Sequence, residues 1–184
     1  MNKREAAQII TVLQINYPDS FKGKTDELIT ATVNLWASIF RDDAYQDVNN
    51  AVMAHMSADT NRFMPPVGVI KARLVKMQHP DEMSDMEAWG YVSKALRNGI
   101  YGYTEEFEKL PPVIRRIVGT PMQLREWAMM DSETVQSVVM SGFRKSYAAR
   151  AESEREFIAL PSDVREVMTQ IAAGMAFPAL GDGR

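Results

Sequence analysis

Apolar residues recur three and four positions apart along almost the whole chain, and no stretch sustains an alternation of apolar and polar residues. A spacing of three and four places side chains on one face of an α-helix, whereas strict alternation is typical of a half-buried strand. The broadest such face consists of Leu28, Ile29, Val33, Leu35, Trp36, Ile39 and Phe40. The sequence therefore predicts an all-α protein, in which the helix around residues 26–40 is central and well buried.

Several predicted helices begin with side chains that can accept hydrogen bonds from free backbone N–H groups. In a capping box, the first residue is followed three positions later by Glu or Gln. This spacing occurs at Asp43–Gln46, Ser84–Glu87 and Thr120–Gln123. Thr25 is a further predicted N-cap, and Asp131 or Ser132 is another. We therefore expect short helices joined by capped turns in both halves of the chain.

Residues 79–83 form the predicted boundary between two domains. The segment is polar, contains Pro80, and directly precedes the capping box that begins at Ser84. A chain of 184 residues fits one compact domain or two small ones. We expect two small helical bundles, residues 1–78 and 84–176, joined by a short polar linker at 79–83. Residues 177–184 are predicted to be a flexible tail.

One residue pattern occurs twice. Segment 107–115 has the form Phe-x-x-Leu-Pro-x-x-Ile-Arg, and segment 157–165 repeats it with Val in place of Ile. Proline is favoured in the first turn of a helix, where its missing N–H has no intrahelical partner. Two copies are weak support for a duplicated repeat. We interpret them as two helix starts of the same kind.

The sequence lacks the patterns that mark common catalytic and metal sites. It contains no cysteine and only two histidines, His55 and His79, which are not spaced as metal ligands. No Gly-rich loop of a phosphate-binding form is present. We therefore expect no metal, no cofactor and no enzymatic activity, and a protein that acts by binding other macromolecules.

The same inventory predicts a cytoplasmic location and no membrane partner. No apolar run approaches the length of a membrane span, and the first residues lead into an amphipathic stretch rather than an apolar signal core. A chain without cysteine suits a reducing compartment.

Methionine and tryptophan residues allow two interpretations. The chain has 13 methionines, including the pair Met129 and Met130. Methionine-rich surfaces adapt to partners, although filling gaps in a core is the commoner use. Trp36, Trp89 and Trp127 lie at helical spacing from other apolar residues, so we predict core positions rather than platforms for base stacking.

Charge is unevenly distributed around a formal net charge of −3. Residues 81–110 carry seven acidic and three basic side chains, whereas residues 111–150 carry six basic and three acidic ones. The six cations are Arg115, Arg116, Arg125, Arg144, Lys145 and Arg150. They are the candidate contacts to an acidic partner or to DNA, although such charges often only solvate the outer face of a helix. The acidic total disfavours binding driven by phosphate contacts.

A set of residues in the first half of the chain matches a known family in order and spacing. These residues are Tyr17, Pro18, Leu35, Trp36, Phe40, Asp42, Tyr45, Val48, Ala51, Val52, Phe63, Pro65, Pro66 and Ile70. Through them the first 77 residues resemble the replicative-helicase loader and inhibitor proteins of phages that infect Gram-positive bacteria. Segments 87–89, 105–111 and 127–131 resemble regions of related phage replication proteins. In short members of the family a flexible tail is implicated in helicase binding. Here the second half is predicted to fold, so no binding residue is carried over.

The resemblance implies a protein adaptor. Such a protein binds the hexameric DnaB-type helicase, inhibits it, and delivers it to a phage initiator bound at the origin. It needs no nucleotide site of its own. The alternative is a helical DNA-binding initiator or regulator with a helix-turn-helix around Arg115 to Arg125, although direct contact with DNA is not favoured. A third alternative is a phage protein with a purely structural partner.

Overall fold

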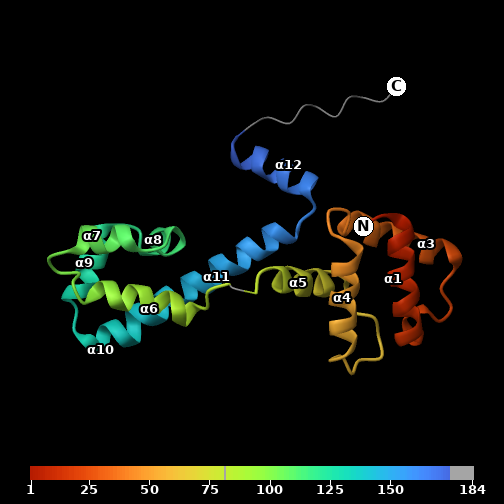
Figure 1. The fold of residues 1–184 in the computed structure, drawn as a ribbon, viewed down its shortest axis with the longest axis horizontal. Helices are drawn as coiled ribbons and strands as arrows, with labels where there is room; N and C mark the ends of the chain where they lie inside the picture. Colours follow the sequence, from red (N-terminus) through yellow and green to blue (C-terminus); the bar gives the residue numbers. More distant parts are fainter. Residues whose placement is uncertain (81, 175–184) are drawn as a thin grey trace. The chain divides into compact units, whose positions relative to one another are not determined.

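The computed structural model describes residues 1–80 and 82–174 (Figure 1). All regular elements in these two ranges are helices, and neither range contains a strand, so the predicted all-α fold is confirmed. The chain divides into two compact units. The first comprises Met1–Pro80 and the described residues from Arg155 onward, and the second is Asp81–Glu154.

The arrangement as two bundles joined by a polar linker stays a prediction, as do the boundaries given above. Residues from Arg155 to Gly174, which the sequence assigns to the second bundle, are grouped with the first unit. The predicted tail at 177–184 lies outside the described residues. No helix in the described part is both long and apolar enough to cross a lipid bilayer.

The first unit contains α1 (Lys3–Asn16), α2 (Pro18–Phe21), α3 (Asp26–Ile39), α4 (Tyr45–Met56), α5 (Val67–Gln78) and α12 (Ser162–Ala172). The helix α1 begins with a capping box between Asn2 and Glu5, in which each side chain accepts a hydrogen bond from the backbone N–H of the other residue. Thr25 caps α3 as predicted, because its hydroxyl accepts a hydrogen bond from the Leu28 N–H.

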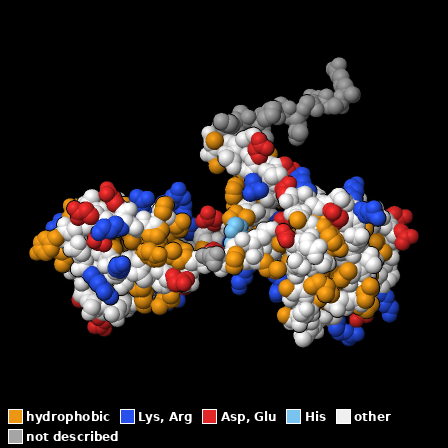
Figure 2. Space-filling model, in the orientation of Figure 1, with side chains coloured by type: hydrophobic (Ala, Val, Ile, Leu, Met, Phe, Trp, Pro, Cys, Tyr) orange, Lys and Arg blue, Asp and Glu red, His pale blue; other side chains and the backbone are white. Residues whose placement is uncertain are grey.

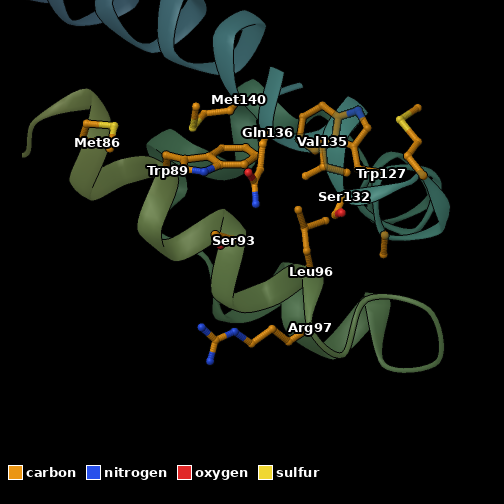
Figure 3. A pocket seen from close by; sticks show the side chains of 12 residues that line it. Met86, Trp89, Ser93, Leu96, Arg97, Trp127, Ser132, Val135, Gln136 and Met140 are labelled. Carbon is orange, nitrogen blue, oxygen red and sulfur yellow. The ribbon is translucent and has the colours of Figure 1, made fainter. Parts of the chain in front are cut away.

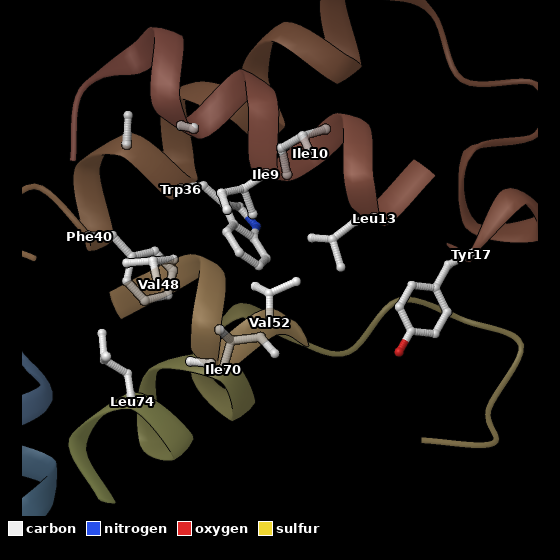
Figure 4. Close-up of a cluster of buried hydrophobic side chains, with 13 residues drawn as sticks. Ile9, Ile10, Leu13, Tyr17, Trp36, Phe40, Val48, Val52, Ile70 and Leu74 are labelled. Carbon is white, nitrogen blue, oxygen red and sulfur yellow. The ribbon is translucent and has the colours of Figure 1, made fainter. Parts of the chain in front are cut away.

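The core of the first unit lies between α1, α3, α4 and α5 (Figure 4). Its largest fully buried side chains are Trp36, Tyr17, Phe40, Ile9, Ile10, Leu13, Ile70, Leu74, Val48 and Val52. The rings of Trp36 and Phe40 pack with centroids 5.3 Å apart. The Tyr17 hydroxyl donates to Oδ2 of Asp59 at 2.7 Å, and burial, the main cause, raises the pKa of Tyr17 to about 12. This hydrogen bond ties the end of α1 to the loop after α4.

The prediction of a wholly buried α3 is wrong. Only Trp36 and Ala37 of this helix are buried, whereas Leu28 and Leu35 are 48% and 53% exposed. Side chains three and four apart share a face, but a broad face is covered only as far as neighbouring helices extend over it. The outer margin of this apolar face therefore remains on the surface.

The predicted capping box at Asp43 is also wrong. The helix α4 begins after Ala44, and no side chain caps it. The carboxylate of Asp43 instead accepts a hydrogen bond from Nζ of Lys71 at 2.5 Å, and this ammonium group also lies 5.4 Å from the centroid of the Phe40 ring. Lys71 is buried, and a buried charge costs much free energy unless it is paired. Pairing with Lys71 therefore takes the carboxylate that the sequence assigned to the cap.

The second unit contains α6 (Asp85–Leu96), α7 (Tyr103–Lys109), α8 (Pro112–Val118), α9 (Pro121–Met129), α10 (Ser132–Thr134), the π-helical turn η1 (Val135–Val139) and the start of α11 (Met140–Ala159). The predicted capping box at Ser84–Glu87 is confirmed, with both of its reciprocal hydrogen bonds. Thr120 and Asp131 also cap as predicted, because their side chains accept from the backbone N–H groups of Gln123 and Thr134.

A separate core holds the second unit together. It consists of Ala88, Trp89, Val92, Ala95, Leu110, Ile114, Val118, Leu124, Val139, Phe143 and Tyr147. Trp89 packs on Phe143 with ring centroids 5.7 Å apart, and the Tyr147 hydroxyl donates to the carbonyl of Met83. Burial raises the pKa of Tyr147 above its usual range. Each unit therefore has its own hydrophobic core.

Candidate interaction surface

The second unit contains a groove of about 500 Å³ between α6, the end of α9, and the helix that runs through η1 into α11 (Figure 3). Its lining combines two tryptophans, three methionines, aliphatic side chains and a few polar ones. A volume of this size lies within the range of about 300–1,000 Å³ that is typical of ligand pockets. All of its walls belong to one unit.

The helix α6 forms one wall of the groove. Met86, Trp89, Ser93 and Leu96 follow one another at intervals of three and four, so they lie on one face of the helix. Trp89 is buried, as predicted, because its ring also packs on Phe143. The same side chain therefore contributes both to the core and to the groove.

The opposite wall depends on the π-helical turn. Val135, Gln136 and Met140 line the groove, although residues five apart point about 140° away from each other in a regular α-helix. Here the Met140 N–H donates to the carbonyl of Val135, which is the i to i+5 bond of a π-helix. This bond places Val135 and Met140 one above the other. The wider turn thus brings both apolar side chains to the groove.

The end of α9 and the following loop supply Trp127 and Met130 to the groove. Trp127 is half-buried and packs against the core of the second unit, so its predicted core position holds for only part of the ring. Met130 and Met86 are exposed. Unbranched methionine side chains change shape at low cost, so this lining can adapt to an apolar surface.

The lining is almost free of charge. Arg97, which follows the last residue of α6, is the one charged side chain among the lining residues, and Ser93, Ser132 and Gln136 supply the polar groups that hydrogen-bond most readily. Within residues 1–80 and 82–174, no group of His, Cys, Asp or Glu is arranged to hold a metal ion. The groove is thus suited to bind an apolar partner surface.

The six cations predicted as contact residues all lie in the second unit, but none lines the groove. Nε of Arg144 on α11 lies 2.7 Å from Oδ2 of Asp85, and this hydrogen bond lowers the pKa of the Asp85 carboxyl. The guanidinium of Arg125 on α9 lies 5.5 Å from the centre of the Tyr103 ring. Arg125 and Arg144 therefore have partners within their own unit.

The remaining four cations lie on two helices. Arg115 and Arg116 lie on α8, and Lys145 and Arg150 lie on α11. Arg115 is half-buried and the others are exposed, and no ion pair joins any of the four to another described residue. They are accordingly the members of the predicted set that can still meet an outside partner.

The helices α8 and α9 are joined by the two-residue turn at Gly119 and Thr120, where the sequence offered a helix-turn-helix. The second helix of such a motif enters the major groove of DNA and usually carries cations. In α9 the charged residues are Arg125, which stacks on Tyr103, and Glu126. This composition does not provide a cationic recognition helix.

The groove was not predicted as a site. Its tryptophans were expected in the core, and the adaptable methionines at 129–130 were the one sequence feature that pointed to a binding surface. Met130 lines the groove, whereas Met129 does not. The two histidines lie on α4 and just after α5 and belong to no described metal cluster.

These features define an all-α protein of two units, one with a closed core and one with an apolar groove, whose surfaces are suited to binding macromolecules. Residues 1–71 match the family model of the phage helicase-loader and inhibitor N-terminal domain. The match confirms the resemblance to phage helicase loader and inhibitor proteins for this part of the chain, and it spans the core of the first unit from Ala6 to Ile70. These residues form the N-terminal domain of a phage helicase-associated replication protein. Neither the curated proteins nor the solved structures gave a match to the chain.

Proposed function

We propose that this protein is a phage DNA-replication adaptor that binds a DnaB-type replicative helicase, inhibits it, and loads it at the origin through an initiator protein. The observation that carries the proposal is the match of residues 1–71 to the N-terminal domain of the helicase-associated family. The proposed site of action is the host cytoplasm.

The surface of the first unit offers apolar side chains for such a contact. Figure 2 shows apolar side chains on the visible face of this unit. Ile15, Leu35 and Phe63 are among its exposed large hydrophobic residues, and Phe63 is 65% exposed beside the Pro65–Pro66 turn. The centres of protein interfaces are enriched in aromatic and apolar residues. Phe63 is therefore the first candidate for a helicase contact.

Inhibition follows from differential affinity. A protein that binds the inactive or open helicase more tightly than the working ring shifts the helicase population toward the inactive state. Moving a population from 1:99 to 99:1 requires a difference of roughly 10⁴-fold in affinity between the two states. Release at the origin requires that the initiator compete for the adaptor or for the helicase surface that it covers. Neither step needs a nucleotide site on the adaptor.

The direct test mixes the purified chain with the host DnaB-type helicase in the absence of DNA. Co-elution on a sizing column with light scattering is expected, together with a fall in ATPase and unwinding rates that saturates with added adaptor. Addition of the initiator and origin DNA should restore unwinding. The absence of both co-elution and ATPase inhibition would contradict the proposal.

A Phe63→Ser variant locates the contact. We expect co-elution to weaken while helicity and thermal unfolding stay unchanged, because the side chain is mostly exposed. Ile15→Ser is the matched control, since Ile15 is a similarly exposed apolar residue on α1. Equal loss in both variants would point to a general effect of surface polarity rather than to the Pro65–Pro66 turn.

The four cations without described ion pairs remain candidates for contact with an acidic partner or with DNA. Titration of duplex DNA against salt separates the two, because each phosphate contact contributes to the salt dependence of binding. We expect weak DNA binding that Arg115→Gln and Arg116→Gln change little. Tight, steeply salt-dependent binding that these variants weaken, without helicase co-elution, would support the DNA-binding alternative.

A further inference from the structure

We infer that the groove of the second unit is a docking site for an amphipathic α-helix of a protein partner, with an acidic residue beside its apolar face. The inference rests on the proposed function only in that the chain acts by binding proteins, and it names the partner element that the groove accepts.

The dimensions of the groove suit a helix. The α6 wall extends from Met86 to Leu96, which at 1.5 Å per residue is about 15 Å. Anchors at positions i, i+3 or i+4, and i+7 of a bound helix span about 10 Å, so two turns fit along this wall. The volume of about 500 Å³ accommodates several buried side chains.

The lining resembles in kind the surfaces that bind amphipathic helices. Such grooves hold apolar anchors from one helix face, and methionine-rich walls adapt to them. Trp89 and Trp127 provide two aromatic surfaces, and Met86, Met130 and Met140 provide three flexible ones. Aromatic side chains near the centre of an interface often supply most of the binding energy.

The charge of the lining selects the flank of the bound helix. Arg97 lies at the carboxyl end of α6, and it forms no hydrogen bond or ion pair with another residue of the described ranges. Figure 3 shows its side chain extending away from the apolar side chains of the groove. A carboxylate on the partner helix can pair with this guanidinium, whereas a cation there would be repelled. A polyanionic nucleic acid is disfavoured, because one cation cannot neutralise a row of phosphates.

The position of Gly90 supports close approach of a second backbone. It lies in the interior of α6, four residues after Met86 and three before Ser93, and therefore on the groove side. Glycine inside a helix costs about 1 kcal/mol relative to alanine. A Cβ at this position would meet nothing within 4 Å, so packing within the unit does not require the glycine. An open strip of backbone beside the groove lets a partner helix come close.

The experiment selects displayed random 14-residue peptides against the full chain. Peptides that bind wild type are counter-selected against Ser93→Arg, which fills the groove from its α6 wall, and against Gly90→Gln, which covers the open strip. We expect the recovered peptides to share apolar residues at i, i+3 or i+4, and i+7, with Asp or Glu alongside. Circular dichroism checks that both variants keep their helicity.

The best peptide is then titrated against the chain by tryptophan fluorescence. We expect Arg97→Glu to weaken its binding at least about tenfold at low salt. Arg150→Glu, the matched control with the same change in charge on an exposed position of α11, should bind as wild type does. Recovery of no peptide, of Pro-rich or basic sequences, or of peptides that bind the groove variants equally well would overturn the inference.

The selection contains no helicase, so its outcome is independent of the co-elution test. Loss of peptide selectivity with intact helicase co-elution would remove the groove and leave the adaptor function standing. A selected acidic amphipathic helix without helicase co-elution would support the groove and contradict the proposed function.

Discussion

The helices α8 and α12 begin with the same residue pattern but differ in what covers them. In α8 the apolar residues Ile114 and Val118 are 0% and 3% exposed, whereas their counterparts Val164 and Met168 in α12 are 38% and 46% exposed. Leu110 before α8 is buried as well. The repeated pattern thus determines where a helix begins, while burial depends on the neighbours that each unit supplies.

The first turns of these helices also solve the problem of free N–H groups differently. The first residue of α8 is Pro112, which has no N–H, whereas the first residue of α12 is Ser162, which has one. The Ser162 N–H donates to Oδ2 of Asp42 at 2.6 Å, and its hydroxyl donates to Oδ1. Neither helix has a side-chain N-cap of its own. Within the first unit, Asp42 therefore serves α12 as a remote cap.

The largest expected difference concerns the apolar faces. Ile114→Ala should destabilise the second unit by about 2–5 kcal/mol, because it removes a fully buried side chain and leaves a cavity. Val164→Ala should change stability by less than about 0.5 kcal/mol. Urea unfolding followed by circular dichroism, with amide exchange to assign the loss to a unit, measures both. Equal costs would show that α12 is packed in solution as α8 is.

The glycines that end the two helices should differ less. Gly119 after α8 and Gly174 near the end of α12 have φ of 89° and 69°, values that L-residues rarely adopt. Gly119→Ala should cost the second unit about 1–2 kcal/mol. Gly174→Ala should only increase fraying of α12, because little else depends on that end. Thermal unfolding and the exchange rates of amides 169–173 would test this, and a cooperative loss from Gly174→Ala would refute it.

Removing the remote cap should have a smaller effect. Asp42→Ala should destabilise α12 by about 1 kcal/mol, the usual net value of a hydrogen bond, and accelerate amide exchange in its first turn. In a Ser162→Pro background the same substitution should cost much less, because that residue then has no N–H or hydroxyl to satisfy. A double-mutant cycle gives the coupling, and additive costs would exclude the cap.

The cap also predicts a dependence on pH. The hydrogen bond from the Ser162 backbone N–H is the main cause that lowers the pKa of Asp42. Since the folded-state pKa lies below the unfolded value, the stabilisation is complete above the unfolded pKa and is lost as pH falls through the folded one. Amide exchange of α12, corrected for intrinsic rates, should therefore reveal opening at acidic pH that Asp42→Asn reduces.

The smallest effect is expected at the ion pair between Arg41 and Asp163, which lies beside the cap. Both side chains are substantially exposed, and such surface pairs contribute about 0–1 kcal/mol. Arg41→Ala should leave thermal unfolding unchanged at physiological salt. A clear loss of stability there would mean that α12 is held by charge more strongly than α8 is held by packing at its own first turn.

The fold was largely predictable from local chemistry. The caps at Thr25, Ser84 and Thr120 were predictable because a cap depends on a few neighbouring residues. Asp43 failed for the opposite reason, since Lys71, 28 residues away, takes its carboxylate. The exposure of α12 was equally hidden, because the pattern shared with α8 does not state which neighbours will cover it.

The groove was not predictable by the same means. Trp89 and Trp127 were expected in the core, and their second role requires α6 and α9 to be placed in space. The π-helical turn has no sequence signal of its own, although the long helix that contains it was expected. Of the six predicted cations, Arg125 and Arg144 proved to be partnered, because Tyr103 and Asp85 come close only in the folded unit.

The π turn makes the groove sensitive to chain length rather than to residue type. Deleting one residue between Val135 and Val139 would restore ordinary helical bonding and keep the helix continuous. It would also rotate Ser132 by about 100° relative to Met140. A gain or loss of a single codon is therefore enough to make or erase this binding surface in a lineage, while Phe143 and Tyr147 continue to hold the unit together.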